Sequence, residues 1–130
     1  MTKTPDLPRP TDAELDILAI LWTRGRCTVR EVHEALQGRK PIQYTTVLKL
    51  MQIMAEKGLV RRDEEQRAHV YEASRPREWT QRQLAGDLLQ RAFGGSAKGL
   101  MLGALSAKRA SKEELAELRK LLDEYEGGKS

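Results

Sequence analysis

The sequence predicts a mainly helical chain with one small β-hairpin, divided into an N-terminal and a C-terminal helical region. Serine or threonine stands three positions before glutamate at three places, which begin at Thr11, Thr28 and Ser111, and this spacing is typical of helix N-termini. Between residues 59 and 73 the apolar residues change from a helical to an alternating period, which indicates strands. The length of 130 residues suits one domain or two very small ones.

The first predicted helix begins at Thr11, since Glu14 completes its capping box. Apolar residues from Leu15 to Trp22 cover more than one stripe of this helix, so we expect it to be buried on most sides and to end at Gly25. A second box, Thr28 with Glu31, opens the next helix. On that helix Val29, Val32 and Leu36 are expected to face the core, and Arg30, Glu31, His33 and Glu34 to face solvent.

The third helix is predicted to begin at Ile42 or Tyr44 and to end at Gly58, since glycine favours the left-handed conformation at a helix C-terminus. Hydroxyl, amide and ammonium side chains gather on one of its faces, which suits base edges in a DNA groove; a solvated face without function is the plain alternative. The apolar face carries Val47, Leu50, Met51 and Met54, and the polar stripe carries Thr45, Lys49, Gln52 and Glu56.

Two short segments, residues 59–63 and 68–73, flank a charged stretch and predict a β-hairpin. Three helices followed by a hairpin is the order of a winged helix-turn-helix domain, in which the third helix lies in the major groove and the wing follows the DNA backbone. The segment Ser74–Pro76 is the predicted end of this domain.

The C-terminal region is predicted to hold three helices. The first runs from Trp79 to Phe93 and ends at Gly94, the second is capped by Ser96, and Ser111 caps the third. Leu115, Leu118, Leu122 and Tyr125 of the last helix repeat as a heptad seam. Three short helices are too small to enclose a core, so we expect a second copy to cover them. The predicted organisation is a flexible tail at 1–10, a DNA-binding domain at 11–74, a dimerisation domain at 75–126 and a flexible tail at 127–130.

Basic residues gather in one block. Residues 39–62 hold six lysines and arginines against one glutamate, whereas residues 12–36 and 113–126 hold more acids than bases. The net charge of +4 is modest, so the placement of the charge matters more than its sum. The block is the candidate electrostatic contact with DNA.

The sequence shows little sign of a catalytic or metal-binding site. Cys27, His33 and His69 are far apart in sequence and show no zinc or copper spacing, so we expect no metal, no cofactor, no small-molecule substrate and no enzymatic activity. Cys27 is the only cysteine, which excludes an intrachain disulfide and favours a cytoplasmic location; a small buried core residue is favoured over a redox thiol. Residues 1–10 carry three prolines and no apolar core, so no secretory signal is expected.

Six short motifs occur in order, at residues 11–15, 29–32, 44–48, 56–59, 67–71 and 93–96. With them, the stretch from Thr11 to Glu124 resembles the penicillinase-repressor family. The resemblance implies a homodimeric repressor on a pseudo-palindromic operator, with Thr45, Thr46 and Lys49 at the DNA and Arg67 as the wing arginine.

The resemblance has departures. Ile53 stands where many members carry arginine, and Gln66 stands where the wing commonly has glycine. In the antibiotic-responsive branch a membrane sensor system leads to cleavage of an Asn-Phe bond after the Gly-Gly turn, and here the equivalent stretch reads Leu102-Gly103-Ala104-Leu105. The family thus implies relief of repression by a signal such as proteolysis, and a membrane sensor protease system as a partner.

The candidate residues form two sets. Those expected to contact double-stranded DNA are Gln43, Tyr44, Thr45, Thr46, Lys49 and Gln52 on the third helix, with Arg39, Lys40, Arg61, Arg62, Arg67 and His69 at the phosphates. Those expected to form the dimer are Trp79, Leu88, Leu89, Leu115, Leu118 and Leu122. The alternative function is a helical protein–protein adaptor whose winged helix binds no DNA.

Overall fold

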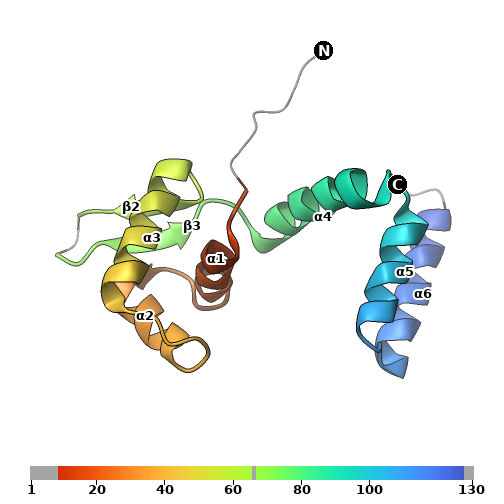
Figure 1. Ribbon diagram of the computed structural model, residues 1–130, viewed down its shortest axis with the longest axis horizontal. Coiled ribbons are helices and arrows are strands. Elements are labelled where there is room, and N and C mark those ends of the chain that lie inside the picture. The colour runs from red at the N-terminus through yellow and green to blue at the C-terminus, as the bar shows by residue number, and fades with distance from the viewer. Residues whose placement is uncertain (1–8, 66, 128–130) are drawn as a thin grey trace, which may run out of the picture. The chain divides into compact units, whose positions relative to one another are not determined.

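The computed structural model describes residues 9–65 and 67–127 (Figure 1). Gln66 and most of both predicted tails lie outside these ranges. Contacts divide the chain into two compact units, Met1–Leu84 and Ala85–Ser130. The elements are α1 (Asp12–Arg24), β1 (Cys27–Thr28), α2 (Val29–Gln37), α3 (Tyr44–Lys57), β2 (Val60–Asp63), β3 (Val70–Ala73), α4 (Arg77–Phe93), α5 (Ala97–Ala107) and α6 (Lys112–Glu126).

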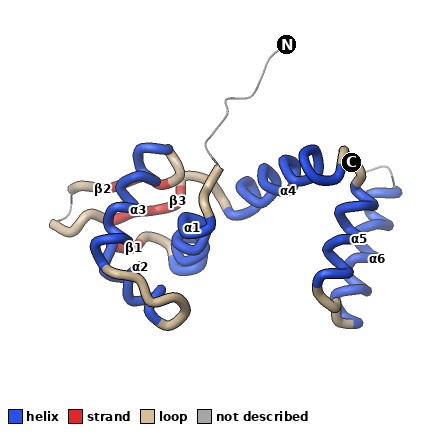
Figure 2. The backbone as a smooth tube through the Cα atoms, viewed as in Figure 1, coloured by secondary structure: helices blue, strands red, loops and turns tan. Residues whose placement is uncertain are grey.

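The first unit contains three helices and the predicted hairpin, and it adds a strand that the sequence did not predict. Cys27 and Thr28 form β1, which pairs antiparallel with β3 through Cys27–Tyr71 and Thr28–Val70. The sheet order is therefore β1-β3-β2 (Figure 2). The prediction of a hairpin alone was incomplete, because a strand of two residues is too short to show a period of its own and exists through its pairing with β3.

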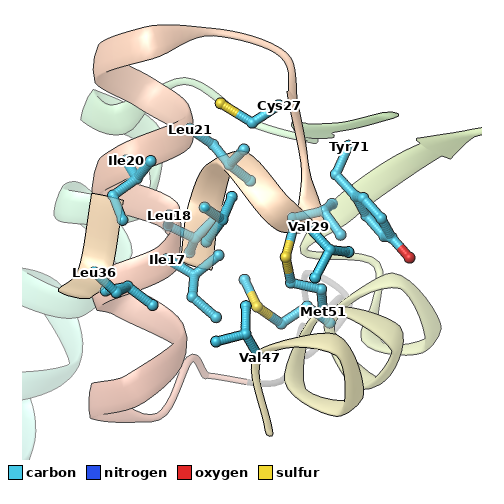
Figure 3. Packing of buried hydrophobic residues seen from close by; sticks show 13 residues of the cluster. Ile17, Leu18, Ile20, Leu21, Cys27, Val29, Leu36, Val47, Met51 and Tyr71 are labelled. Carbon is cyan, nitrogen blue, oxygen red and sulfur yellow. The ribbon is translucent and has the colours of Figure 1, made fainter. Parts of the chain in front are cut away.

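One hydrophobic core holds this unit together, and its buried residues come from α1, β1, α2, α3, β2 and β3. Figure 3 shows Val47 and Met51 on α3 directed toward Ile17 and Leu18 on α1. Met51, Met54 and Cys27 are buried core residues, as predicted. Leu50 is half-buried beside this cluster. Because one face of α3 is fully occupied by this packing, its opposite face is left to solvent.

The helix boundaries follow the predicted signals closely. Thr11 and Thr28 each accept from the amide of the glutamate three residues on, and that glutamate side chain accepts in return from the threonine amide. At Ser111 the structure has one half of the predicted box, the bond from the Glu114 amide to the serine hydroxyl at 3.0 Å. Gly58 follows α3 with φ +83°, the left-handed conformation that L side chains avoid.

The second unit lacks buried residues on its last two helices. In α5 and α6, both fully described, every side chain remains exposed or half-exposed. The division between the units falls inside α4. The domain boundary at residue 74 stays a prediction, because a compact set of contacts does not test independent folding. Across the described ranges, each helix is too short or too polar to cross a bilayer.

Candidate nucleic-acid interface

The outward face of α3 is polar and accessible. Val47, Met51 and Met54 are 0% exposed on the inner face. All four members of the polar stripe, Thr45, Lys49, Gln52 and Glu56, are exposed, and so are Gln43, Tyr44 and Thr46 at the helix start. The core therefore fixes which side chains this helix presents.

The first turn of α3 begins without a side-chain cap. Gln43 occupies the N-cap position in an extended conformation, and its side chain makes no capping bond. Its carbonyl accepts from the amides of Thr46 and Val47 at 3.0 and 3.1 Å. Helix N-termini carry partial positive charge, so this end of α3 suits the approach of a DNA phosphate.

The loop before α3 is held by α2. Gln37 Nε2 donates to the Ile42 carbonyl at 2.8 Å and lies 2.7 Å from His33 Nε2, which is itself 3.0 Å from that carbonyl. The His33 ring also meets the Tyr44 ring edge-on, with centroids 5.5 Å apart. The prediction that His33 is an exposed residue was wrong: it is half-buried, because the loop from α2 to α3 folds back over it.

Three of the six candidate lysines and arginines of the interface have acidic partners. Lys40 Nζ lies 3.4 Å from Asp16, Arg61 lies 4.0 Å from Glu72, and Arg62 lies 2.6 Å from Glu64. In the described ranges, Arg39, Lys49 and Arg67 make no ion pair and are exposed. Free cations have no partner to leave when they meet phosphate, so these three are the best placed of the predicted contacts.

One lysine of the basic block, Lys57, is neutralised by a buried acid. Its ammonium group lies 2.9 and 3.0 Å from the two carboxylate oxygens of Glu14. Glu14 is 2% exposed and also accepts from the Thr11 amide. This pair was not predicted, although Glu14 stands four and seven positions before Leu18 and Leu21, on the stripe of α1 that faces the core.

The wing has an anchored start. Asp63 accepts from the Glu65 amide at 2.9 Å and from Arg26 at 2.6 Å, and these two bonds lower the pKa of Asp63. Hydrogen bonds to the Tyr71 and Glu64 side chains raise the pKa of Arg62. Arg67 and His69 are exposed beyond Gln66, which lies outside the described residues. Asp63 thus remains a carboxylate and Arg62 a cation at neutral pH.

The predicted dimer residues are divided between the two units. Trp79 lies in the first unit and is half-buried, with the guanidinium carbon of Arg75 4.8 Å above its ring centroid. In the second unit Leu89, Leu115 and Leu118 are half-buried, whereas Leu88 and Leu122 are 47% and 51% exposed.

Metal and thiol chemistry find no assembled site in the described part of the chain. There, no three His, Cys, Asp or Glu side chains are grouped to hold an ion. Cys27 is 3% exposed, and its burial raises the pKa of the thiol, which keeps it protonated and unreactive near neutral pH.

Three known proteins are similar to this chain, two in sequence and one in fold. The transcriptional regulator BlaI of Mycobacterium tuberculosis (strain ATCC 25618 / H37Rv) is 35% identical over 123 residues, which cover 94% of this chain and 88% of the relative. The penicillinase repressor of Bacillus licheniformis is 24% identical over 123 residues, or 95% and 96% of the two chains. The solution structure of the DNA binding domain of the repressor BlaI matches with a TM-score of 0.50 at 22% identity, covering 57% of this chain and 90% of that domain.

The structural match shows the winged-helix fold of the N-terminal region. The sequence match is broader, since the family model described as penicillinase repressor covers residues 10–124 and therefore includes the C-terminal helices. On these grounds the chain belongs to the penicillinase repressor family of winged-helix transcriptional regulators.

Proposed function

We propose that this protein is a dimeric transcriptional repressor that blocks a promoter by occupying a pseudo-palindromic operator. The observation that carries the proposal is the exposed polar face of α3, which combines Thr45, Thr46 and Lys49 with an uncapped helix start. Side chains of this kind make hydrogen bonds to base edges, and the first-turn amides suit a phosphate. A helix presented in this way enters the major groove by its first turns.

The surroundings of α3 supply the contacts that fix its register on DNA. Arg39 precedes the helix and Arg67 lies in the wing, and both are exposed cations without an acidic partner among the described residues. Lys40, Arg61, Arg62 and His69 would join them once DNA competes for the first three cations, whose pairs are solvent-exposed and weak. Phosphate contacts of this kind position a protein without reading sequence.

Dimer formation is assigned to the C-terminal helices. Leu102, Leu122 and Tyr125 are 63%, 51% and 64% exposed, which is a large apolar exposure for two helices with no buried residue. Soluble proteins cover such faces with a partner, and a second copy on a two-fold axis matches a pseudo-palindromic operator. Trp79, Leu88, Leu89, Leu115, Leu118 and Leu122 are the residues proposed for the interface.

Relief of repression is assigned to a signal that separates the two copies, such as proteolysis within α5. Its residues Leu102 and Leu105 are exposed, and loss of the C-terminal helices would leave two winged helices that bind half-sites independently and therefore weakly. A membrane sensor protease system is the proposed source of the signal, and the cytoplasm is the proposed location.

A gel-shift assay with the DNA upstream of the protein's own gene tests this function. We expect one retarded complex at nanomolar protein, competed by the same duplex and much less by random DNA. Equal competition by both duplexes, or no retardation, would instead favour the adaptor, in which the apolar helices bind another protein and the winged helix binds nothing.

A further inference from the structure

The start of α4 is tied to the end of α1 by contacts outside the proposed DNA interface. The indole nitrogen of Trp22 donates to the carbonyl oxygen of Arg75 at 2.9 Å. Arg77, the first residue of α4, donates to the Thr23 hydroxyl at 3.1 Å and lies 5.8 Å from the Trp22 ring centroid. We name Trp22, Thr23, Arg75 and Arg77 the junction clamp.

A second layer of contacts holds the first turn of α4 beyond the clamp. The guanidinium carbon of Arg75 lies 4.8 Å from the Trp79 ring centroid. The amides of Trp79 and Thr80 bond to the Pro76 carbonyl, and Thr80 is 8% exposed. All these residues lie within the first compact unit. Figure 2 shows the loop after β3 passing α1 before α4 begins.

The clamp joins segments that are 53 and 54 residues apart in sequence. Exposed hydrogen bonds and cation–π contacts each contribute little to stability. The three contacts of the clamp meet at one loop, and one of them is made to the loop backbone itself, so together they act on the direction of the loop. The clamp therefore fixes the path by which the chain leaves the winged helix.

We propose that the junction clamp sets the half-site spacing that this repressor accepts, an inference that rests on the dimeric function proposed above. In such a dimer the chain from each α3 to the dimer interface passes through the start of α4. One added base pair moves a half-site by roughly 3.4 Å and turns it by roughly 35° about the DNA axis. A fixed junction rejects that displacement, whereas a loose junction absorbs it. Trp22 and Arg77 are thus positioning residues for spacing.

The experiment uses the full chain and duplexes with two half-sites. The parent chain first selects its half-site sequence from a random pool. A duplex series then varies the spacer between two half-sites by one base pair at a time, with a single half-site as reference. Two variants weaken the clamp, Trp22→Phe and Arg77→Ala. Arg82→Ala is the matched control, because Arg82 is an exposed arginine of the same helix with no ion pair or hydrogen bond in the described structure.

We expect the parent and Arg82→Ala to bind one spacing best. Both clamp variants should bind the single half-site as the parent does, lose about tenfold on the best spacing, and show a flatter profile across the series, because part of the avidity depends on geometry. Binding to the single half-site also shows that each variant is folded. If Trp22→Phe unfolds, Arg77→Ala still tests the clamp, because Arg77 is exposed and its replacement leaves the core intact.

Two results overturn the inference and are distinct from each other. Clamp variants that keep the parent's spacing profile, or a parent chain that gains from a second half-site but prefers no spacing, contradict the clamp alone and leave the dimeric repressor standing. A parent chain that selects no DNA, or that binds two half-sites no more tightly than one, contradicts the proposed function, and the clamp falls with it.

Discussion

Lys49 and Lys57 stand about two turns apart on α3, yet the fold gives them different tasks. Lys49 is exposed and makes no ion pair in the described structure, whereas Lys57 is bound to the buried carboxylate of Glu14. A count of basic residues treats the two alike. Only the environment separates the lysine that can meet DNA from the one that holds the helix in place.

The first prediction concerns Lys49. Lys49→Ala and Thr46→Ala are each expected to cost about 1–3 kcal/mol of binding free energy on the operator and little on random DNA, because groove contacts carry sequence preference. Fluorescence anisotropy with both duplexes measures the difference. Lys112→Ala removes the same charge from α6 and is expected to bind as the parent does. Equal losses on both duplexes would reduce Lys49 and Thr46 to phosphate contacts.

The second prediction concerns Glu14. Glu14→Gln retains an acceptor for the Thr11 amide but removes the charge that holds Lys57. We expect the free energy of unfolding in urea to fall by about 1–3 kcal/mol, less than for a fully buried pair because Lys57 keeps some contact with water. Glu56→Gln, on the exposed stripe of α3 beside Lys57, is expected to change this free energy by less than about 0.5 kcal/mol. If Glu14→Gln and Glu56→Gln have the same free energy of unfolding, the Glu14–Lys57 pair is energetically neutral.

At the scale of elements, the helices were easier to predict than the strand pairs and the side-chain contacts between distant segments. Capping boxes placed the starts of α1 and α2, and glycine placed the ends of α1 and α3, because these signals are local. Strand β1 was missed because its partner β3 lies more than forty residues away in sequence. The pairing of Glu14 with Lys57 and that of Trp22 with the Arg75 carbonyl were missed for the same reason. The exposed face of α3 was predictable in full, since its opposite face has a clear apolar period.

The wing gives a prediction at this scale. Arg67→Ala is expected to weaken binding to all DNA sequences alike and to lower the slope of log affinity against log salt by about one per subunit, since one phosphate contact is lost. A titration from low to moderate salt measures the slope. Arg30→Ala changes an exposed arginine of α2 that makes no ion pair with any residue the structure describes, and it is expected to leave the slope unchanged. A change in sequence preference would mean that the wing reads bases.

At the scale of the whole molecule, the chain divides its apolar residues unequally. The core of the described structure is built by elements from α1 to β3, and α5 and α6 contribute no buried residue. A single copy therefore has a hydrophobic core in its N-terminal unit and no buried residue on its last two helices. Because of this imbalance, we expect the association of two copies and tight binding to the operator to appear together.

Leu118→Glu tests this division of labour, because an ionised carboxylate is costly to bury in an apolar seam. The variant is expected to sediment as a monomer, to keep the thermal transition of the winged helix, and to lose tight operator binding while retaining weak half-site binding. Lys120→Glu places the same carboxylate at an exposed position of α6 and is expected to stay dimeric. A dimeric Leu118→Glu, or a monomer that binds the full operator as the parent does, would contradict the assignment.

The glycine that ends α3 carries one more consequence. A Cβ added at Gly58 would meet no atom within 4 Å, yet the residue has φ +83°. Space is therefore available, and what the position rejects is the L configuration rather than the size of a side chain. The mirror image of this conformation, near φ −83° and ψ −10°, is an ordinary one for L residues. The end of α3 is thus selective for handedness: its backbone conformation strains an L residue and is an ordinary one for a D residue.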